Sequence, residues 1–307
     1  MVQGLQGALD GWRDDPAVEA IVIEGAGGRS FCAGGDIRQV RHLVLAERYV
    51  DAEAFFADEY ALNLAIARYP KPYVALIDGV CMGGGMGLSI HGSARVVTEA
   101  AVLAMPETGI GFFPDIGASS FLPQLPGEHG MFLALTGARV HGADAIRLGL
   151  ATHQVARDRV SALADELAEK GIGALAHADM PILTDSTLED AEVIACFGAG
   201  TVAGILERLA NLKSVTAQNA LSTLRARSPT AVLRTFELMR LGASRTLEQC
   251  LATERELAGH AIRHPDFAEG VRAMVIDKDR NPRWRPAQIK DVPLDEVKAL
   301  FRQLDAG

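Results

Sequence analysis

The sequence predicts an α/β core followed by a mostly helical C-terminal region. In the first half of the 307-residue chain, short apolar runs alternate with glycine turns and with stretches of helical periodicity. This rhythm is typical of a sheet with helices packed against it. In the second half, leucine and alanine recur at helical spacing, which indicates amphipathic helices. We therefore expect a core that carries the active site over residues 1–155 and a helical region over residues 156–307.

The individual elements follow from the length and spacing of the apolar runs. Four runs have the length of a buried strand, at residues 18–24, 73–78, 94–98 and 102–104. Helical spacing in the first half covers residues 5–13, 49–68 and 84–92. Helices of the second half are expected at residues 157–169, 187–197, 202–211, 215–225, 230–242, 246–261 and 294–304.

The composition excludes several classes of protein. With 49% hydrophobic and 22% charged residues, the chain has the composition of an ordinary globular protein. Its net charge of −9 argues against a nucleic-acid partner, and no apolar run is long enough for a membrane span. The four cysteines are widely spaced and the eight histidines lack metal-ligand spacing, so no metal site is expected. The first residues carry no secretory pattern, and we expect a cytoplasmic location.

The segment 105–117, which reads MPETGIGFFPDIG, is the strongest candidate for chemistry. It holds two carboxylates, Glu107 and Asp115, among Gly, Pro, Phe, Ile, Met and Thr. Apolar neighbours withhold solvent from a carboxylate and raise its pKa, which lets it act as an acid, base or nucleophile near neutral pH. Alternatively, Glu107 caps a turn and Asp115 a helix, as most acids in Gly/Pro loops do.

Two glycine clusters upstream strengthen the catalytic interpretation. SFCAGGDI (30–37) and MGGGMG (82–87) each follow a run of strand length. Glycine allows a backbone N–H group to approach a ligand closely, and a following helix adds positive potential. Two such loops directed at one point would form an oxyanion hole, which stabilises negative charge on a carbonyl oxygen. The alternative is that these glycines merely permit tight turns and close packing.

The order of three segments, FCAGGDI, KPYVALIDGVCMGGGMGLSIHG and AMPETGIGFFPDIG, resembles the enoyl-CoA hydratase/isomerase (crotonase) superfamily. Within it, the chain most resembles the 3-hydroxyisobutyryl-CoA hydrolases. The resemblance implies a spiral of stacked ββα turns with a helical C-terminal region. It also implies an acyl-CoA substrate, no separate cofactor because coenzyme A is part of that substrate, and a homo-oligomer as in many members.

The resemblance also assigns roles to individual residues. Gly35 and Gly84 match the two oxyanion-hole donors, and Glu107 matches the acid shared by many members. Asp115 matches the second acid of the hydrolases, and Glu59 matches a further acid that contacts the substrate. These assignments predict catalysis by Glu107, Asp115, Gly35 and Gly84, with Glu59 in substrate binding.

Coenzyme A is polyanionic, so its binding needs a local basic patch. Arg29 and Lys278 are the candidates for contacts to coenzyme A. We expect most of the other arginines to lie on the solvated surface.

The chain departs from the superfamily pattern at two places. Hydratases of this superfamily have a segment that resembles GGGxE, and they use its glutamate as one of two carboxylates that hydrate a double bond. This chain has Met86 at the variable position and Gly87 at the position of the glutamate. Hydration is therefore disfavoured by the residue at position 87. Residues 1–9 look like the middle of the family's first helix, so we expect the preceding strand hairpin to be missing.

Three functions remain open at this level. The leading one is hydrolysis of a short 3-hydroxyacyl-CoA thioester, with Glu107 either attacking the carbonyl or activating a water molecule. A hydratase or double-bond isomerase is the second, because one glutamate suffices to move a proton. A non-catalytic acyl-CoA-binding or assembly subunit is the third.

Overall fold

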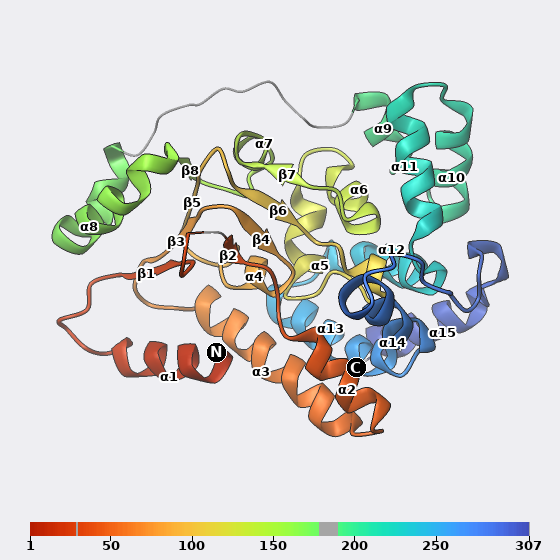
Figure 1. The fold of residues 1–307 in the computed structure, drawn as a ribbon, viewed down its shortest axis with the longest axis horizontal. Coiled ribbons are helices and arrows are strands. Elements are labelled where there is room, and N and C mark those ends of the chain that lie inside the picture. The colour runs from red at the N-terminus through yellow and green to blue at the C-terminus, as the bar shows by residue number, and fades with distance from the viewer. Residues whose placement is uncertain (29, 178–189, 307) are drawn as a thin grey trace. The chain divides into compact units, whose positions relative to one another are not determined.

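The computed structural model describes residues 1–28, 30–177 and 190–306, which form two compact units interleaved along the chain (Figure 1). Unit 1 comprises Met1–Gly35, Asp58–Ala104 and the described part of 139–188. Unit 2 comprises Asp36–Ala57, Met105–Ala138 and residues 190–306. The expected division at residue 155 follows the chain and not these units, and it stays a prediction.

Unit 1 is built on two sheets, each with four strands in the part of the chain described. The first sheet is parallel and has the order β1 (Ile21–Glu24), β3 (Tyr73–Ile77), β5 (Ala94–Val97) and β8 (His153–Gln154). The second has the order β2 (Ser30–Cys32), β4 (Val80–Met82), β6 (Val102–Ala104) and β7 (Val140–His141), with β7 antiparallel to β6. Consecutive strands β1 to β6 thus alternate between the sheets, which is the predicted repeat of ββα turns (Figure 1).

Strand β3 lies at the centre of the first sheet, and all five of its residues are buried. It is a continuous apolar run, as expected of a parallel strand covered on both faces. Val74 and Leu76 of β3 pack with Val96 of β5 and with Leu163 and Leu167 of the helix α8 (Val160–Lys170). This cluster forms the core between the first sheet and helix α8.

The remaining helical segments of unit 1 are short or lie at its edge: α1 (Val2–Trp12), α4 (Gly84–Gly87), α7 (Gly142–Leu148), η3 (Arg157–Arg159) and η4 (Gly171–His177). Helix α3 (Tyr49–Ala67) contributes its residues up to Ala57 to unit 2 and the others to unit 1.

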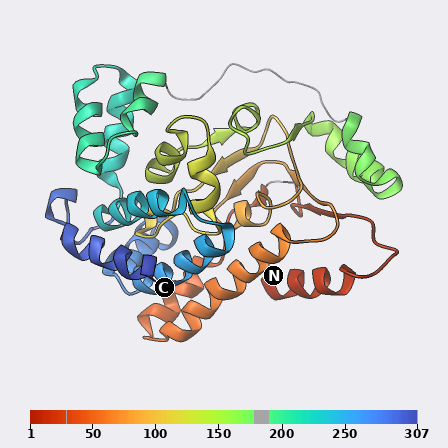
Figure 2. The same ribbon diagram turned by 180° about the vertical axis from the view of Figure 1, so that it is seen from behind.

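Unit 2 is helical. Its N-terminal and middle segments are α2 (Ile37–Leu45), η1 (Glu107–Ile110), α5 (Ala118–Phe121), η2 (Leu122–Gln124) and α6 (His129–Thr136). Its C-terminal segments are α9 (Ala191–Cys196), α10 (Val202–Asn211), α11 (Val215–Ala226), α12 (Pro229–Gly242), α13 (Leu247–Ile262), α14 (Pro265–Val271), η5 (Arg272–Ile276), η6 (Ile289–Asp291) and α15 (Leu294–Ala306). Helix α12 is central in this unit, because it packs against α5, α6, α13 and α15. In Figure 2, α15 is the blue ribbon that ends at the C-terminus.

The predicted elements are largely confirmed. Strand β6 and helix α10 begin and end where they are expected, and α13 is displaced by one residue. The expected helix 84–92 ends at Gly87. Just beyond it, the Ser89 hydroxyl donates to the carbonyl of Gly85, and the Ser89 nitrogen donates to the carbonyl of Met86 instead. The expected helix 187–197 lies partly outside the described residues, and its described part is α9.

Several short elements escape the sequence analysis, among them β2, β4, α2, α6 and α14. The expectation that most arginines lie on the solvated surface fails for Arg95, Arg227 and Arg234, which are partly buried. Arg95 shows why a buried arginine is tolerated: its guanidinium donates to the carbonyls of Leu150 and Gly92 at 2.9 and 3.1 Å.

Candidate active site

The two glycine loops of unit 1 lie against each other. A Cβ atom added to Gly34 would lie 3.4 Å from the carbonyl oxygen of Met82 and 3.9 Å from the nitrogen of Gly84. A Cβ atom added to Gly84 would lie 3.4 Å from the nitrogen of Gly35. Gly34 has φ of +109° and Gly83 has φ of +52°, which is backbone that favours glycine. The backbone nitrogens of Gly35 and Gly84 therefore lie close to each other, and the oxyanion hole that they would form stays a prediction.

The strands explain why these loops meet. β2 and β4 are parallel neighbours, with Ser30 paired to Val80 and Cys32 to Cys81. Parallel strands end at the same edge of a sheet, so the segments that leave them are adjacent. The first loop continues from β2 to Gly35, and the second continues from β4 through Gly83 to helix α4. The sequence thus brings its two glycine clusters together by strand pairing.

Glu59 lies beside Gly84. It is on helix α3 and is 8% exposed, and a Cβ atom on Gly84 would overlap its carboxylate oxygen. Only glycine therefore fits at residue 84 while the Glu59 side chain stays where it is. One helical turn later, Asn63 is fully buried, and neither polar atom of its amide finds a hydrogen-bond partner among residues 1–28, 30–177 and 190–306. The sequence analysis missed Asn63, although its spacing from Glu59 places both on one helix face.

The second group of predicted residues belongs to unit 2. Glu107 begins the 3₁₀ turn η1 and is 7% exposed. Its carbonyl oxygen accepts from the nitrogen of Phe112 at 3.0 Å, and Gly111 ends the turn in the left-handed conformation. Asp115, 5% exposed, follows in the same loop. Both predicted acids are thus buried, and seven residues lie between them in the sequence.

An aromatic cluster supplies the apolar surroundings that the sequence analysis expected. The ring of Phe112 stacks on Phe113 with centroids 4.4 Å apart and on Phe56 with centroids 5.0 Å apart. Phe267 packs against Phe112 in a tilted arrangement at 5.8 Å. These rings exclude water from the segment between Glu107 and Asp115.

Arg227 lies near Glu107 and was missed. Its Nε donates to the carbonyl oxygen of Thr136 at 3.0 Å, and a Cβ atom on Gly109 would lie 2.7 Å from its Nη1. Burial lowers the pKa of Arg227, and the negative charge of Glu107 acts in the opposite direction. A partly buried cation therefore lies within electrostatic range of the predicted catalytic acid. No motif distinguishes Arg227 from the other 23 arginines in the sequence.

Glu254 on α13 is a further buried acid that the sequence analysis missed. Its carboxylate accepts from the nitrogen of Gly117 at 2.6 Å and from the nitrogen and hydroxyl of Ser119 at 3.0 and 2.6 Å. Burial raises the pKa of Glu254 to about 8, and the charge of Asp115 adds to the increase while the hydrogen bonds oppose it. One signal could have found Glu254: it occupies an apolar position of the helix pattern, between Cys250 and Leu257.

Two predicted residues remain, the candidates for contacts to coenzyme A. Lys278 is exposed and has φ of +58° just after η5. Arg29 lies outside the described residues. Within residues 1–28, 30–177 and 190–306, no set of three or more His, Cys, Asp or Glu side chains is arranged to hold a metal ion. No helix of these residues combines the length and apolarity that a membrane crossing needs.

Comparison with known proteins gives relatives along the whole chain. The chain is 42% identical over 317 residues to the 3-hydroxyisobutyryl-CoA hydrolase, mitochondrial, of Rattus norvegicus, with 99% of this chain and 82% of the relative covered. It is 41% identical over 320 residues to the human protein of the same name, with 100% and 83% covered. The expected enzyme type, an acyl-CoA thioester hydrolase like these relatives, is thereby confirmed.

The expectation of a cytoplasmic location is wrong on this comparison, because the curated relatives are named as mitochondrial. That expectation was inferred from the lack of a secretory pattern in the first residues. The lack of one targeting pattern does not specify a compartment.

Solved structures and a family-level match agree on the fold. A carnitinyl-CoA dehydratase from Mycobacterium thermoresistibile superposes with a TM-score of 0.92 at 39% identity, over 98% of this chain and 88% of the other. An enoyl-CoA hydratase from Rhodobacter sphaeroides superposes with a TM-score of 0.87 at 38% identity and the same coverage. The family described as enoyl-CoA hydratase/isomerase matches residues 1–301. The chain therefore belongs to the enoyl-CoA hydratase/isomerase family, as its glycine loops and its MPETGIGFFPDIG segment predict.

Proposed function

We propose that this protein hydrolyses the thioester of a short 3-hydroxyacyl-CoA, with 3-hydroxyisobutyryl-CoA as the substrate and the free acid and coenzyme A as products. One observation supports this most: Glu107 and Asp115 are both buried in one segment, while position 87 carries glycine. Glu107 and Asp115 match the two acids of the hydrolases, whereas Gly87 stands where a hydratase has its second carboxylate. The names of the relatives point to the same substrate.

In the proposed reaction, the backbone N–H groups of Gly35 and Gly84 donate to the thioester oxygen. They stabilise the negative charge that develops on this oxygen, and one such donor is typically worth about 3 kcal/mol in the barrier. Their contribution needs no side chain, which agrees with the overlap that any Cβ atom at Gly84 would produce.

Glu107 supplies the proposed nucleophile or base. If its carboxylate attacks the carbonyl carbon, a C–O bond forms, the C–S bond breaks, and the coenzyme A thiolate leaves and takes up a proton. Water then cleaves the mixed anhydride and regenerates Glu107. If Glu107 instead removes a proton from water, hydroxide attacks directly and the same products form. A carboxylate base contributes about a hundred- to ten-thousandfold to the rate.

Asp115 and Glu59 are proposed to recognise the substrate hydroxyl. Both side chains are buried, at 5% and 8% exposure, and a plain acyl chain offers them nothing to bind. A site built to hydrogen-bond a hydroxyl discriminates strongly against an analogue that lacks it, because the hydrogen bonds to that hydroxyl are then lost.

Hydration of an enoyl-CoA is the second candidate, because the two superposed structures are those of a carnitinyl-CoA dehydratase and an enoyl-CoA hydratase. The two candidates are separated by following thiol release and the absorbance of a conjugated thioester on the same preparation. We expect thiol release from 3-hydroxyisobutyryl-CoA and no comparable loss of crotonyl-CoA absorbance.

The substrate assignment is tested with a matched pair of thioesters. Thiol release is measured from 3-hydroxyisobutyryl-CoA and from isobutyryl-CoA, which differ only in the hydroxyl group. We expect a clear preference in kcat/KM for the hydroxylated substrate. Equal values for the two would contradict the proposed roles of Asp115 and Glu59.

A further inference from the structure

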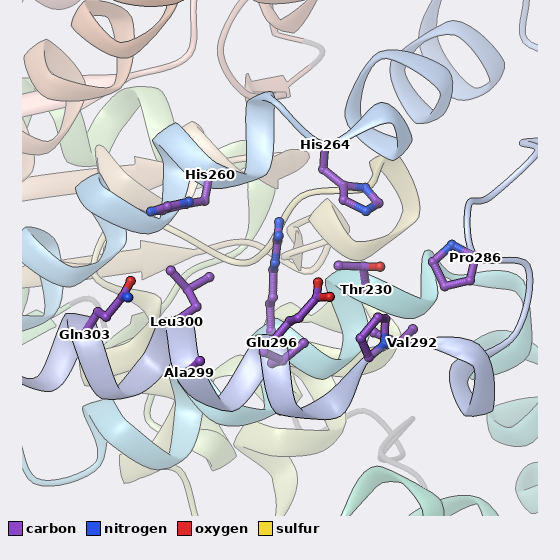
Figure 3. A pocket seen from close by; sticks show the side chains of 12 residues that line it. Thr230, His260, His264, Pro286, Val292, Glu296, Ala299, Leu300 and Gln303 are labelled. Atoms are coloured by element: carbon purple, nitrogen blue, oxygen red, sulfur yellow. The ribbon is translucent and has the colours of Figure 1, made fainter.

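A pocket lies within unit 2, among helices α12, α13 and α15 (Figure 3). Its volume is about 390 Å³, which is in the range of pockets that hold small molecules. None of the residues that line it belongs to the segment 105–117 or to the glycine loops. The residues assigned to the proposed reaction are therefore not among those that line this pocket.

Two buried polar atoms at this pocket lack partners. Thr230 and Arg234 both line it and are one turn apart on α12. Thr230 is only 6% exposed, and its Oγ1 and the Nε of Arg234 are buried with no hydrogen-bond partner among the described residues. Unpaired buried donors are costly, so native proteins usually satisfy them. Both atoms are covered in the structure, so a ligand could accept from them only after the side chains around them shift.

His264 adds a third donor. Its Nδ1 accepts from the nitrogen of Asp266 at 3.3 Å and caps helix α14. In the neutral ring the proton is therefore on Nε2, which is left to donate. Burial lowers the pKa of His264, and the positive charge of Arg234 lowers it further while the charge of Asp266 acts in the opposite direction. Figure 3 shows His264 and Thr230 on the same side of the pocket.

The nearby acids do not occupy these donors. The two carboxylate oxygens of Asp266 accept from the hydroxyl of Ser228 at 2.6 Å and from the nitrogen of Arg285 at 2.7 Å. Glu296 lines the pocket from α15 and is exposed. Its negative charge favours a ligand with one charge over a dianion, because Arg234 supplies the one permanent positive charge among the lining residues.

We propose that this pocket binds the anion of a small monocarboxylic acid, whose oxygens accept from Arg234 and Thr230. The Nε and Nη groups of an arginine form a planar fork that matches the two oxygens of a carboxylate. Val292, Val297 and Leu300 line the pocket and offer an apolar wall for a short aliphatic tail. The ligand class is therefore a carboxylate with a small apolar group.

The test uses isobutyrate as the probe and the full chain, with ligand-observed NMR titration. Wild type should bind with a Kd near or below about 10 mM, a weak affinity suited to so small a ligand. Arg234→Met should weaken binding at least tenfold, and Thr230→Val should weaken it several-fold. Arg302→Met, which removes an exposed arginine of α15 that does not line the pocket, should bind like wild type.

Circular dichroism establishes that each variant is folded. If Arg234→Met does not fold, Thr230→Val decides the question, because it removes one hydroxyl at nearly constant shape. Binding that is undetectable in wild type, or unchanged in folded Arg234→Met or in Thr230→Val, would overturn the proposal. Inorganic phosphate that binds as tightly as isobutyrate would also overturn it, since the site would then not be specific for a monocarboxylate. These outcomes do not depend on thiol release, so they are independent of the proposed hydrolase activity.

Discussion

The carboxylate of Glu254 lies 2.6 Å from the backbone nitrogen of Gly117, two residues after Asp115. Ser119 adds two further hydrogen bonds to the same carboxylate. A helix that is 137 residues away in the sequence thereby fixes the turn that follows Asp115. Glu254 acts through this turn and is a positioning residue for the candidate site.

Loss of the Glu254 carboxylate should therefore loosen this turn. Glu254→Ala leaves the nitrogens of Gly117 and Ser119 buried without an acceptor, which typically costs about 1–3 kcal/mol each. We expect a clear fall in the urea midpoint of unfolding and in kcat. Glu256→Ala is the matched control, because Glu256 is exposed on the same helix. Equal unfolding midpoints for the two variants would contradict the positioning role.

Glu254 also predicts how stability depends on pH. Burial raises its pKa from 4.5 to about 8 in the folded protein, so between these values the folded state binds more protons than the unfolded state. The contribution of Glu254 to the unfolding free energy is therefore fully present below 4.5 and is lost as pH rises through about 8. Urea unfolding over this range should show the decline, and Glu254→Gln should reduce it. An identical pH dependence in wild type and Glu254→Gln would exclude this origin.

Gly84→Ala tests the geometry of the glycine loops. The added Cβ atom overlaps the carboxylate of Glu59 and lies 3.4 Å from the nitrogen of Gly35. We expect kcat/KM to fall by about a hundredfold or more, as when one oxyanion-hole donor is lost. Gly7→Ala is the control, because a Cβ atom there meets nothing within 4 Å. Activity within twofold of wild type in a folded Gly84→Ala variant would remove Gly84 from the site.

Gly87 predicts the outcome with an unsaturated substrate. Because glycine cannot supply the second carboxylate of a hydratase, loss of crotonyl-CoA absorbance should be far slower than thiol release from 3-hydroxyisobutyryl-CoA. Both rates are measured on one preparation, with Glu107→Gln as the blank for catalysis by the site. Comparable rates would favour the hydratase alternative.

Some elements and site residues could be predicted from the sequence, and others could not. β6 and α10 were predicted to the residue from their apolar spacing. The two glycine loops were singled out by their composition and by the strand-length runs before them, whereas Glu59 was singled out only through the family resemblance. Glu254 and Arg227 were not, because their roles arise from contacts with Gly117 and Gly109 that lie far away in the sequence. The chemistry proposed for the site thus comes from local motifs, whereas the contacts that support these motifs depend on tertiary packing.

The most direct test of the account is the kcat/KM for thiol release by Glu107→Gln with 3-hydroxyisobutyryl-CoA. The substitution keeps the shape of the side chain and removes its charge, so neither anhydride formation nor base catalysis can proceed. We predict a loss of at least about a hundredfold, the lower end of what a carboxylate base contributes, with an unchanged unfolding midpoint. A folded Glu107→Gln variant that keeps more than about a tenth of wild-type activity would contradict the central role of Glu107.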